Sequence, residues 1–228
     1  MSESSLVRRR EKVISDKGLS AREIPKALSE ITDEFLVELY AREVGDNDGV
    51  ALVALGGYGR AELAPSSDLD LMLIHQDRDD IDALADRIWY PLWDEGFKLG
   101  HSVRSVEQTL RLASTDLETA TSLLNARLVA GDSTLLEELL TRNEQQWVRD
   151  GLDRLDELVR NVNRRHRLSG EVAFLLEPDL KEGRGGLRDV HAINWAARAG
   201  IEVPTHDHER LAEAYQVLLE ARVELHRI

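Results

Sequence analysis

The chain has 228 residues, of which 42% are hydrophobic and 32% are charged, and this balance indicates a globular protein rather than a disordered one. It has no cysteine, which excludes a disulfide scaffold and any thiolate metal site. The formal net charge of −14 argues against nucleic acid as a partner. No apolar run approaches the length of a membrane span and the N-terminus has no apolar signal segment, so we expect no membrane partner and a cytoplasmic location.

Hydrophobic spacing predicts alternating helices and strands in the first part of the chain. Helices have apolar residues three or four positions apart, whereas the strands are short apolar runs that end at glycine or polar clusters. The expected elements are a helix over 21–43, a strand over 50–55, a strand over 69–75, a helix over 77–95 and a short strand over 97–103.

From Ser105 onward the spacing is almost entirely helical, apart from the glycine-rich segment 168–187. We therefore predict an α+β fold, in which a domain with a small mixed sheet (1–140) precedes a helical domain (141–228). The last residues keep helical spacing without a stop signal, so a truncation of the second domain at the C-terminus is expected. The predicted helices are 105–113, 116–129, 133–160, 188–199 and 207–228.

Two aspartates, Asp68 and Asp70, interrupt the apolar second strand. Side chains alternate between the faces of a strand, so both carboxylates should share one face while Leu69 and Leu71 point into the core. Neighbouring carboxylates repel each other unless a cation lies between them. Because Mg²⁺ prefers oxygen ligands of this kind, the pair is predicted to bind a magnesium ion.

Small and polar residues around this pair are candidates for binding a polyphosphate. Gly56 and Gly57 follow the first strand and have no Cβ, so phosphate oxygens can approach their backbone N–H groups. Arg60 follows one turn later, and its guanidinium group is able to donate hydrogen bonds to two phosphate oxygens at once. Ser66 and Ser67 precede the acidic pair and add hydroxyl donors.

The order of strand, glycine pair and Asp-x-Asp strand resembles the DNA polymerase β-like nucleotidyltransferase superfamily. More narrowly, GGYGRAELAPSSDLDLML (56–73) is similar to the N-terminal domain of the PII uridylyltransferase/uridylyl-removing enzyme family. The likeness continues in the segments GHSVRS (100–105), ARLVAGD (126–132), Arg165-His166 and LEPDLKEGRGGLRDVHAINW (176–195).

This resemblance implies a polymerase β-like domain that transfers UMP from UTP, or AMP from ATP, to a tyrosine hydroxyl of the regulatory protein PII, releasing pyrophosphate. It implies that Asp68 and Asp70 are catalytic and bind two Mg²⁺ ions. A third carboxylate is expected on a later strand, but the strand over 97–103 has none. Asn125 stands where the resemblance implies Asp or Glu.

The resemblance also brings in Lys181 and Arg188, which flank three glycines. It implies that they contact the nucleotide or order a loop over it, while the residues alone are equally typical of a solvated loop before a helix. Two other functions stay open. One is the related adenylyltransferase that modifies glutamine synthetase, and the other is a catalytically silent nucleotide-binding module of a signalling protein.

Overall fold

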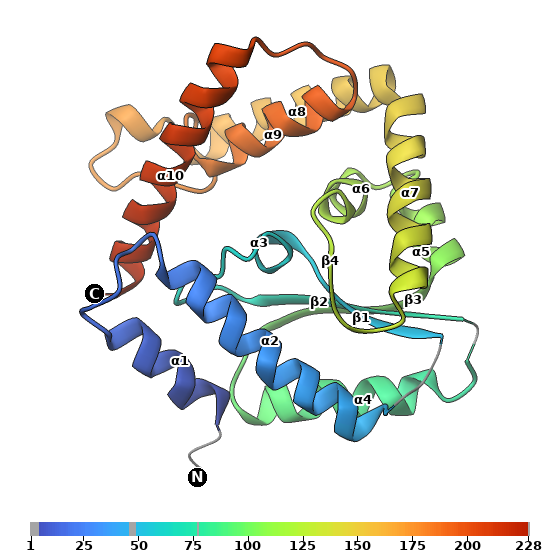
Figure 1. Ribbon diagram of the computed structural model, residues 1–228. Helices are drawn as coiled ribbons and strands as arrows, with labels where there is room; N and C mark the ends of the chain where they lie inside the picture. The colour runs from blue at the N-terminus through green and yellow to red at the C-terminus, as the bar shows by residue number, and fades with distance from the viewer. Residues whose placement is uncertain (1–4, 46–48, 77, 228) are drawn as a thin grey trace. The chain divides into compact units, whose positions relative to one another are not determined.

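The computed structural model describes residues 5–45, 49–76 and 78–227 (Figure 1). Contacts within the chain define two compact units, Met1–Asn143 with His226–Ile228, and Glu144–Leu225. The predicted division into 1–140 and 141–228 stays a prediction, because a compact unit need not coincide with a functional domain.

The first unit consists of a four-stranded sheet and the helices around it. The strands have the order β3-β2-β1-β4, in which β1 pairs antiparallel with β2 and β4 while β2 pairs parallel with β3. The predicted α+β class with a small mixed sheet is therefore confirmed. The elements are α1 Leu6–Ser15, α2 Ile24–Glu43, β1 Val50–Ala54, α3 Gly56–Gly59, β2 Leu69–His75, α4 Ile81–Asp94, β3 Leu99–Ser105, α5 Val106–Ala113, α6 Leu117–Leu123, β4 Arg127–Gly131 and the first part of α7 Ser133–Arg149.

The second unit is helical in its described residues. Its core includes Trp147 near the end of α7, whose indole N–H donates to the backbone carbonyl of Trp195 at 3.0 Å. A buried indole needs such an acceptor, so this bond fixes α7 against the helix that carries Trp195. The elements are the end of α7, α8 Gly151–Ser169, a 3-10 turn Val172–Phe174, α9 Leu187–Arg198 and α10 Thr205–Arg227 up to Leu225.

A short helix, α3, follows directly after the central strand β1. All five residues of β1 are buried, as expected for a run of Val, Ala and Leu between two neighbouring strands. Gly56 follows with φ +56°, a conformation that other residues adopt only at a cost, and starts the one-turn helix α3. At Gly59 an added Cβ would lie 2.2 Å from the Asn125 carbonyl oxygen and 2.9 Å from that of Ala54. Helix α3 is therefore packed directly against neighbouring backbone.

The structure differs from the predicted secondary structure at α1, in the segment after Leu123 and at Asp150. Helix α1 was not predicted, because only Leu6 and Arg10 are buried in it and they form no apolar stripe. The predicted helix over 116–129 is wrong after Leu123, since Arg127–Gly131 forms β4 on β1. The predicted helix over 133–160 is divided at Asp150, where α7 ends and α8 begins.

We predict that Gly59→Ala destabilises the first unit by about 1–3 kcal/mol, the usual cost of overpacking, because its methyl group meets two fixed carbonyl oxygens. Gly18→Ala is the matched control: Gly18 is exposed and its added Cβ meets only the Asp16 side chain, so a change within about 0.5 kcal/mol is expected. Urea unfolding followed by circular dichroism measures both. Equal losses in the two variants would contradict the tight packing of α3.

Candidate active site

Asp70 lies within the central strand β2, where its neighbours on either side are core residues. Leu69 and Leu71 are buried, at 0% and 1% exposure, whereas Asp70 is half-buried. The predicted direction of the two leucines is therefore confirmed. The backbone carbonyl of Asp70 also accepts a hydrogen bond of 2.9 Å from the Leu55 N–H, which ties the end of β1 to this residue.

Two glycines enclose the Asp70 carboxylate. A Cβ added to Gly56 would lie 2.7 Å from Oδ2 of Asp70, and one added to Gly100 would lie 2.3 Å from Oδ1. Gly100 is the parallel partner of Asp70 on β3. Any larger residue at either position would displace the carboxylate, so both glycines help to determine where it lies in the candidate site. Gly56 was a candidate from its position after the first strand, whereas the role of Gly100 depends on strand pairing and was not predicted.

The other predicted residues just before β2 are close to Asp70 in the sequence. Asp68 is exposed and immediately precedes β2. Ser67 accepts the Ala64 N–H at 3.2 Å through its hydroxyl oxygen, and the Ser66 N–H donates to Nδ1 of His226 at 3.4 Å. The direction of the Asp68 side chain relative to Asp70 stays a prediction.

Arg60 ends helix α3 and lies beside the glycine pair. Its Nε donates to Oε2 of Glu62 at 2.7 Å, and its Nη2 is 3.9 Å from the position of a Cβ at Gly57. The guanidinium group is thus held close to the backbone that was predicted to bind phosphate, and Glu62 balances its charge.

The donor set fits magnesium that is bound together with a substrate. Mg²⁺ is commonly held by one or two carboxylates plus waters and substrate phosphates, and Asp68 and Asp70 are of that kind. Among the residues that the structure describes, no group of three or more His, Cys, Asp or Glu side chains is arranged to hold a metal. Asn125 precedes β4 in a turn and presents an amide, so the expected third carboxylate is not found at this position.

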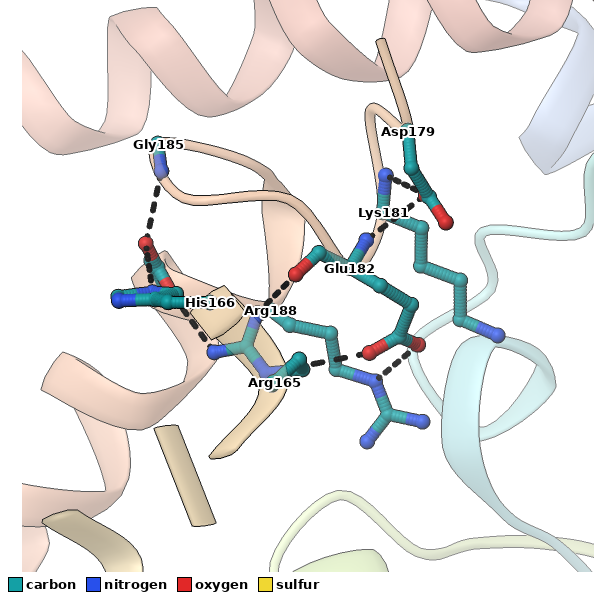
Figure 2. A network of polar contacts seen from close by, with 8 residues as sticks. Arg165, His166, Asp179, Lys181, Glu182, Gly185 and Arg188 are labelled. Carbon is teal, nitrogen blue, oxygen red and sulfur yellow. Dashed lines mark hydrogen bonds and ion pairs between the residues drawn. The ribbon is translucent and has the colours of Figure 1, made fainter. Parts of the chain in front are cut away.

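Lys181 and Arg188 lie in the second unit, Lys181 in the loop that leads into α9 and Arg188 in the first turn of α9 (Figure 2). The Lys181 N–H donates to Oδ1 of Asp179 at 2.9 Å, and Nε of Arg188 lies 3.3 Å from Oε1 of Glu182. Arg188 is therefore paired with a carboxylate of the loop that precedes its helix. A contact of either cation with a nucleotide stays a prediction.

Asp189 holds this loop together. Its carboxylate accepts the Gly185 N–H at 2.8 Å, Nη2 of Arg165 at 2.5 Å and Nε2 of His166 at 2.9 Å. Burial raises the pKa of Asp189, but the hydrogen bonds from Gly185, His166 and Arg165 outweigh it and hold that pKa below its usual value. The charged form of Asp189 thus fastens the loop to helix α8.

A glycine turn beside a strand carboxylate in a small mixed sheet is typical of a nucleotidyltransferase. Two family models match the chain and agree with this class: putative nucleotidyltransferase DUF294 over residues 7–109, and GlnD PII-uridylyltransferase over residues 153–228.

Similar proteins named bifunctional uridylyltransferase/uridylyl-removing enzyme occur in several bacteria. One from Streptomyces coelicolor is 47% identical over 88% of this chain and 24% of that protein. Others from Mycobacterium tuberculosis and Caulobacter vibrioides are 44% and 34% identical, over 82% and 80% of this chain and 24% and 21% of those proteins. The chain thus spans about a quarter of the length of these relatives. Its resemblance to the nucleotidyltransferase part of this enzyme family is confirmed.

We predict that Gly100→Ala displaces the Asp70 carboxylate and weakens binding of a magnesium–nucleotide complex by about tenfold or more, because changing the groups that orient a metal ligand typically costs about 10–100-fold in metal affinity. Isothermal titration with Mg²⁺ and UTP or ATP measures the affinity. The control is His101→Ala, the next residue on β3, whose ring packs against Trp89 and Trp93 instead. Unchanged affinity in the Gly100 variant would show that Asp70 is not part of the binding site.

We predict that Asp189→Asn lowers the free energy of unfolding of the second unit at neutral pH. The folded pKa of Asp189 is depressed, so its stabilisation is complete above the ordinary carboxyl pKa of about 3.9 and is lost as the pH falls through the lower folded pKa. Urea unfolding at a series of pH values should give a constant difference from wild type above about pH 5 and a shrinking one below about pH 4. The exposed Glu209→Gln serves as control. A difference that does not change with pH would refute this role of the charge.

Proposed function

We propose that this chain carries a Mg²⁺-dependent nucleotidyltransferase site that transfers UMP from UTP to a tyrosine hydroxyl of the protein PII and releases pyrophosphate. The observation that supports this most directly is the position of the Asp70 carboxylate, which is enclosed by Gly56, the first residue of the glycine turn, and by Gly100 on β3. The relatives, named as uridylyltransferases, support the choice of nucleotide and the name PII in the matching family model supports the acceptor. We further propose a cytoplasmic location. No helix in the described ranges has the length and apolar character needed to cross a membrane.

The residues of the first unit have distinct roles in this proposal. The backbone N–H groups of Gly56 and Gly57 bind phosphate oxygens, because nothing projects from their Cα atoms to keep the phosphates away. Arg60 adds a guanidinium beside them. Asp68 and Asp70 hold the metal, which when bound neutralises the phosphates and favours ionisation of the attacking hydroxyl. In such reactions positioning and charge neutralisation supply most of the rate, so fixed geometry around Asp70 is the main contribution of the fold.

A second candidate is a catalytically silent nucleotide-binding module. It is favoured by one observation, the lack of a third metal-binding carboxylate among the described residues, where position 125 is Asn. A module of this kind would bind a nucleotide without transferring it.

A transfer assay separates these functions. The protein is incubated with PII, Mg²⁺ and labelled UTP or labelled ATP, and the label on PII is measured with and without a chelator. Label from UTP supports the proposal, and label from ATP alone would change the donor. Nucleotide binding without any label on PII would favour the silent module, and label on glutamine synthetase in a parallel reaction would favour the related adenylyltransferase.

We predict that Asp70→Asn abolishes transfer while the protein still folds. Wild-type protein should be stabilised by Mg²⁺ and nucleotide through mass action, by about 2.7 kcal/mol at 100 times the dissociation constant, and the variant should lose this stabilisation. Thermal melting with and without ligand measures it. Asp86→Asn, which changes an exposed carboxylate of helix α4, is the control that should keep both the transfer activity and the stabilisation by ligand. A full ligand-induced shift in the Asp70 variant would place the site elsewhere.

A further inference from the structure

Tyr58 lies inside the glycine turn, between Gly57 and Gly59, and is connected to a helix far away in the sequence. Its side chain is 1% exposed, and its hydroxyl donates a hydrogen bond of 2.5 Å to Oδ1 of Asp33 in α2. Burial and this hydrogen bond hold the pKa of Tyr58 above its usual range, so the hydroxyl stays protonated and remains a donor.

Arg127, the first residue of β4, closes the network. Its Nη1 donates to Oδ2 of Asp33 at 2.9 Å and its Nη2 to Oδ1 at 3.0 Å, which is the bidentate geometry of a strong arginine–carboxylate pair. The guanidinium also lies 5.3 Å from the centre of the Tyr58 ring, and Nη2 is 3.4 Å from the Tyr58 carbonyl oxygen. Arg127 thus contacts both the side chain and the backbone of Tyr58.

These contacts determine where the glycine turn lies. A helix of four residues has too few internal hydrogen bonds to hold its own position. On one side the turn is fixed by the Leu55 N–H bond to the Asp70 carbonyl, and on the other by Asp33 and Arg127 through Tyr58. The backbone of Gly56, at which an added Cβ would lie 2.7 Å from Oδ2 of Asp70, is between these two attachments in the chain.

We propose that Asp33, Tyr58 and Arg127 are positioning residues for nucleotidyl transfer, which hold the backbone of Gly56 and Gly57 at the correct distance from Asp70 for a magnesium–nucleotide complex. This inference rests on the proposed function of the same site. None of the three residues needs to touch the substrate. Their effect is on the alignment of phosphate groups with the metal-binding carboxylate, an alignment in which errors of about 1 Å cost on the order of 100-fold.

The test compares conservative variants with a matched arginine elsewhere in the same unit. Arg127→Lys keeps the charge but removes the bidentate fork, Asp33→Asn removes the charge, and Tyr58→Phe removes only the hydroxyl. Arg142→Lys is the control, because Arg142 is also paired with two carboxylates, Glu107 of α5 and Glu138 of its own helix α7. Circular dichroism and melting temperature are recorded for every variant.

The decisive readouts are the dissociation constants for Mg²⁺–UTP and Mg²⁺–ATP and the separate KM values for nucleotide and PII. Arg127→Lys and Asp33→Asn should weaken nucleotide binding and lower kcat/KM for the nucleotide by about 10–100-fold while the KM for PII is unchanged. Tyr58→Phe should have a smaller effect in the same direction, and Arg142→Lys none. A lowered melting temperature with unchanged nucleotide binding and unchanged kcat would overturn the inference and leave only a structural role.

Failure of the proposed function gives a different result. If wild-type protein binds a nucleotide but labels no PII, the proposed transfer is wrong, whereas weakened nucleotide binding in the Asp33 and Arg127 variants still supports the positioning role. Absence of any nucleotide binding by wild type would overturn both.

Discussion

The close approach of the Asp70 carboxylate to two glycines is the constraint on which the site depends. Most of β2 is buried, and an ionised carboxylate there is costly unless polar groups or a cation meet it. The fold leaves room for it by placing Gly56 and Gly100, which have no side chains, against its two oxygens. The antiparallel pairing of β1 with β2 brings Gly56 to this point, and the parallel pairing of β2 with β3 brings Gly100. Both kinds of strand pairing in this sheet thus contribute to the position of the Asp70 carboxylate.

Local sequence patterns were sufficient to predict the parts of this arrangement that lie close together in the chain. The apolar runs predicted β1 and β2, and the alternation around Asp70 predicted that Leu69 and Leu71 are buried. The glycine pair and the acidic pair follow one another within a short segment, so their spacing alone suggested a common site. These features depend on the periodicity of apolar residues and on residues that are neighbours in the chain, and both can be read directly from a sequence.

The parts that could not be predicted depend on contacts between distant segments. Nothing local distinguishes Gly100 from a glycine in a turn, because its function arises from its register opposite Asp70. In the sequence Asp33 cannot be distinguished from other polar residues of a helix, because its pairing with Arg127 depends on the position of β4. The strand β4 was itself predicted as helix, since Ala, Arg and Leu favour helices and only the pairing with β1 makes this segment a strand. The break at Asp150 was not predicted, because in the sequence Gly151 is compatible with a continuous helix as well as with a break. The structure shows a contact with a distant segment there: a Cβ added to Gly151 would lie 3.0 Å from the Ala199 carbonyl oxygen.

The distribution of charge supports the proposed dependence on magnesium. The chain has a formal net charge of −14, so a nucleoside triphosphate is repelled at long range. The arginines near the candidate site are paired with carboxylates: Arg60 with Glu62 at 2.7 Å and Arg127 with Asp33 at 2.9 Å. Such pairs provide hydrogen-bond donors in fixed positions but little net positive charge. In the second unit Arg188 is likewise close to Glu182. Because these side chains are already balanced, we propose that the charge that offsets the phosphates comes mainly from a cation at Asp68 and Asp70, and that the arginines act through geometry more than through charge.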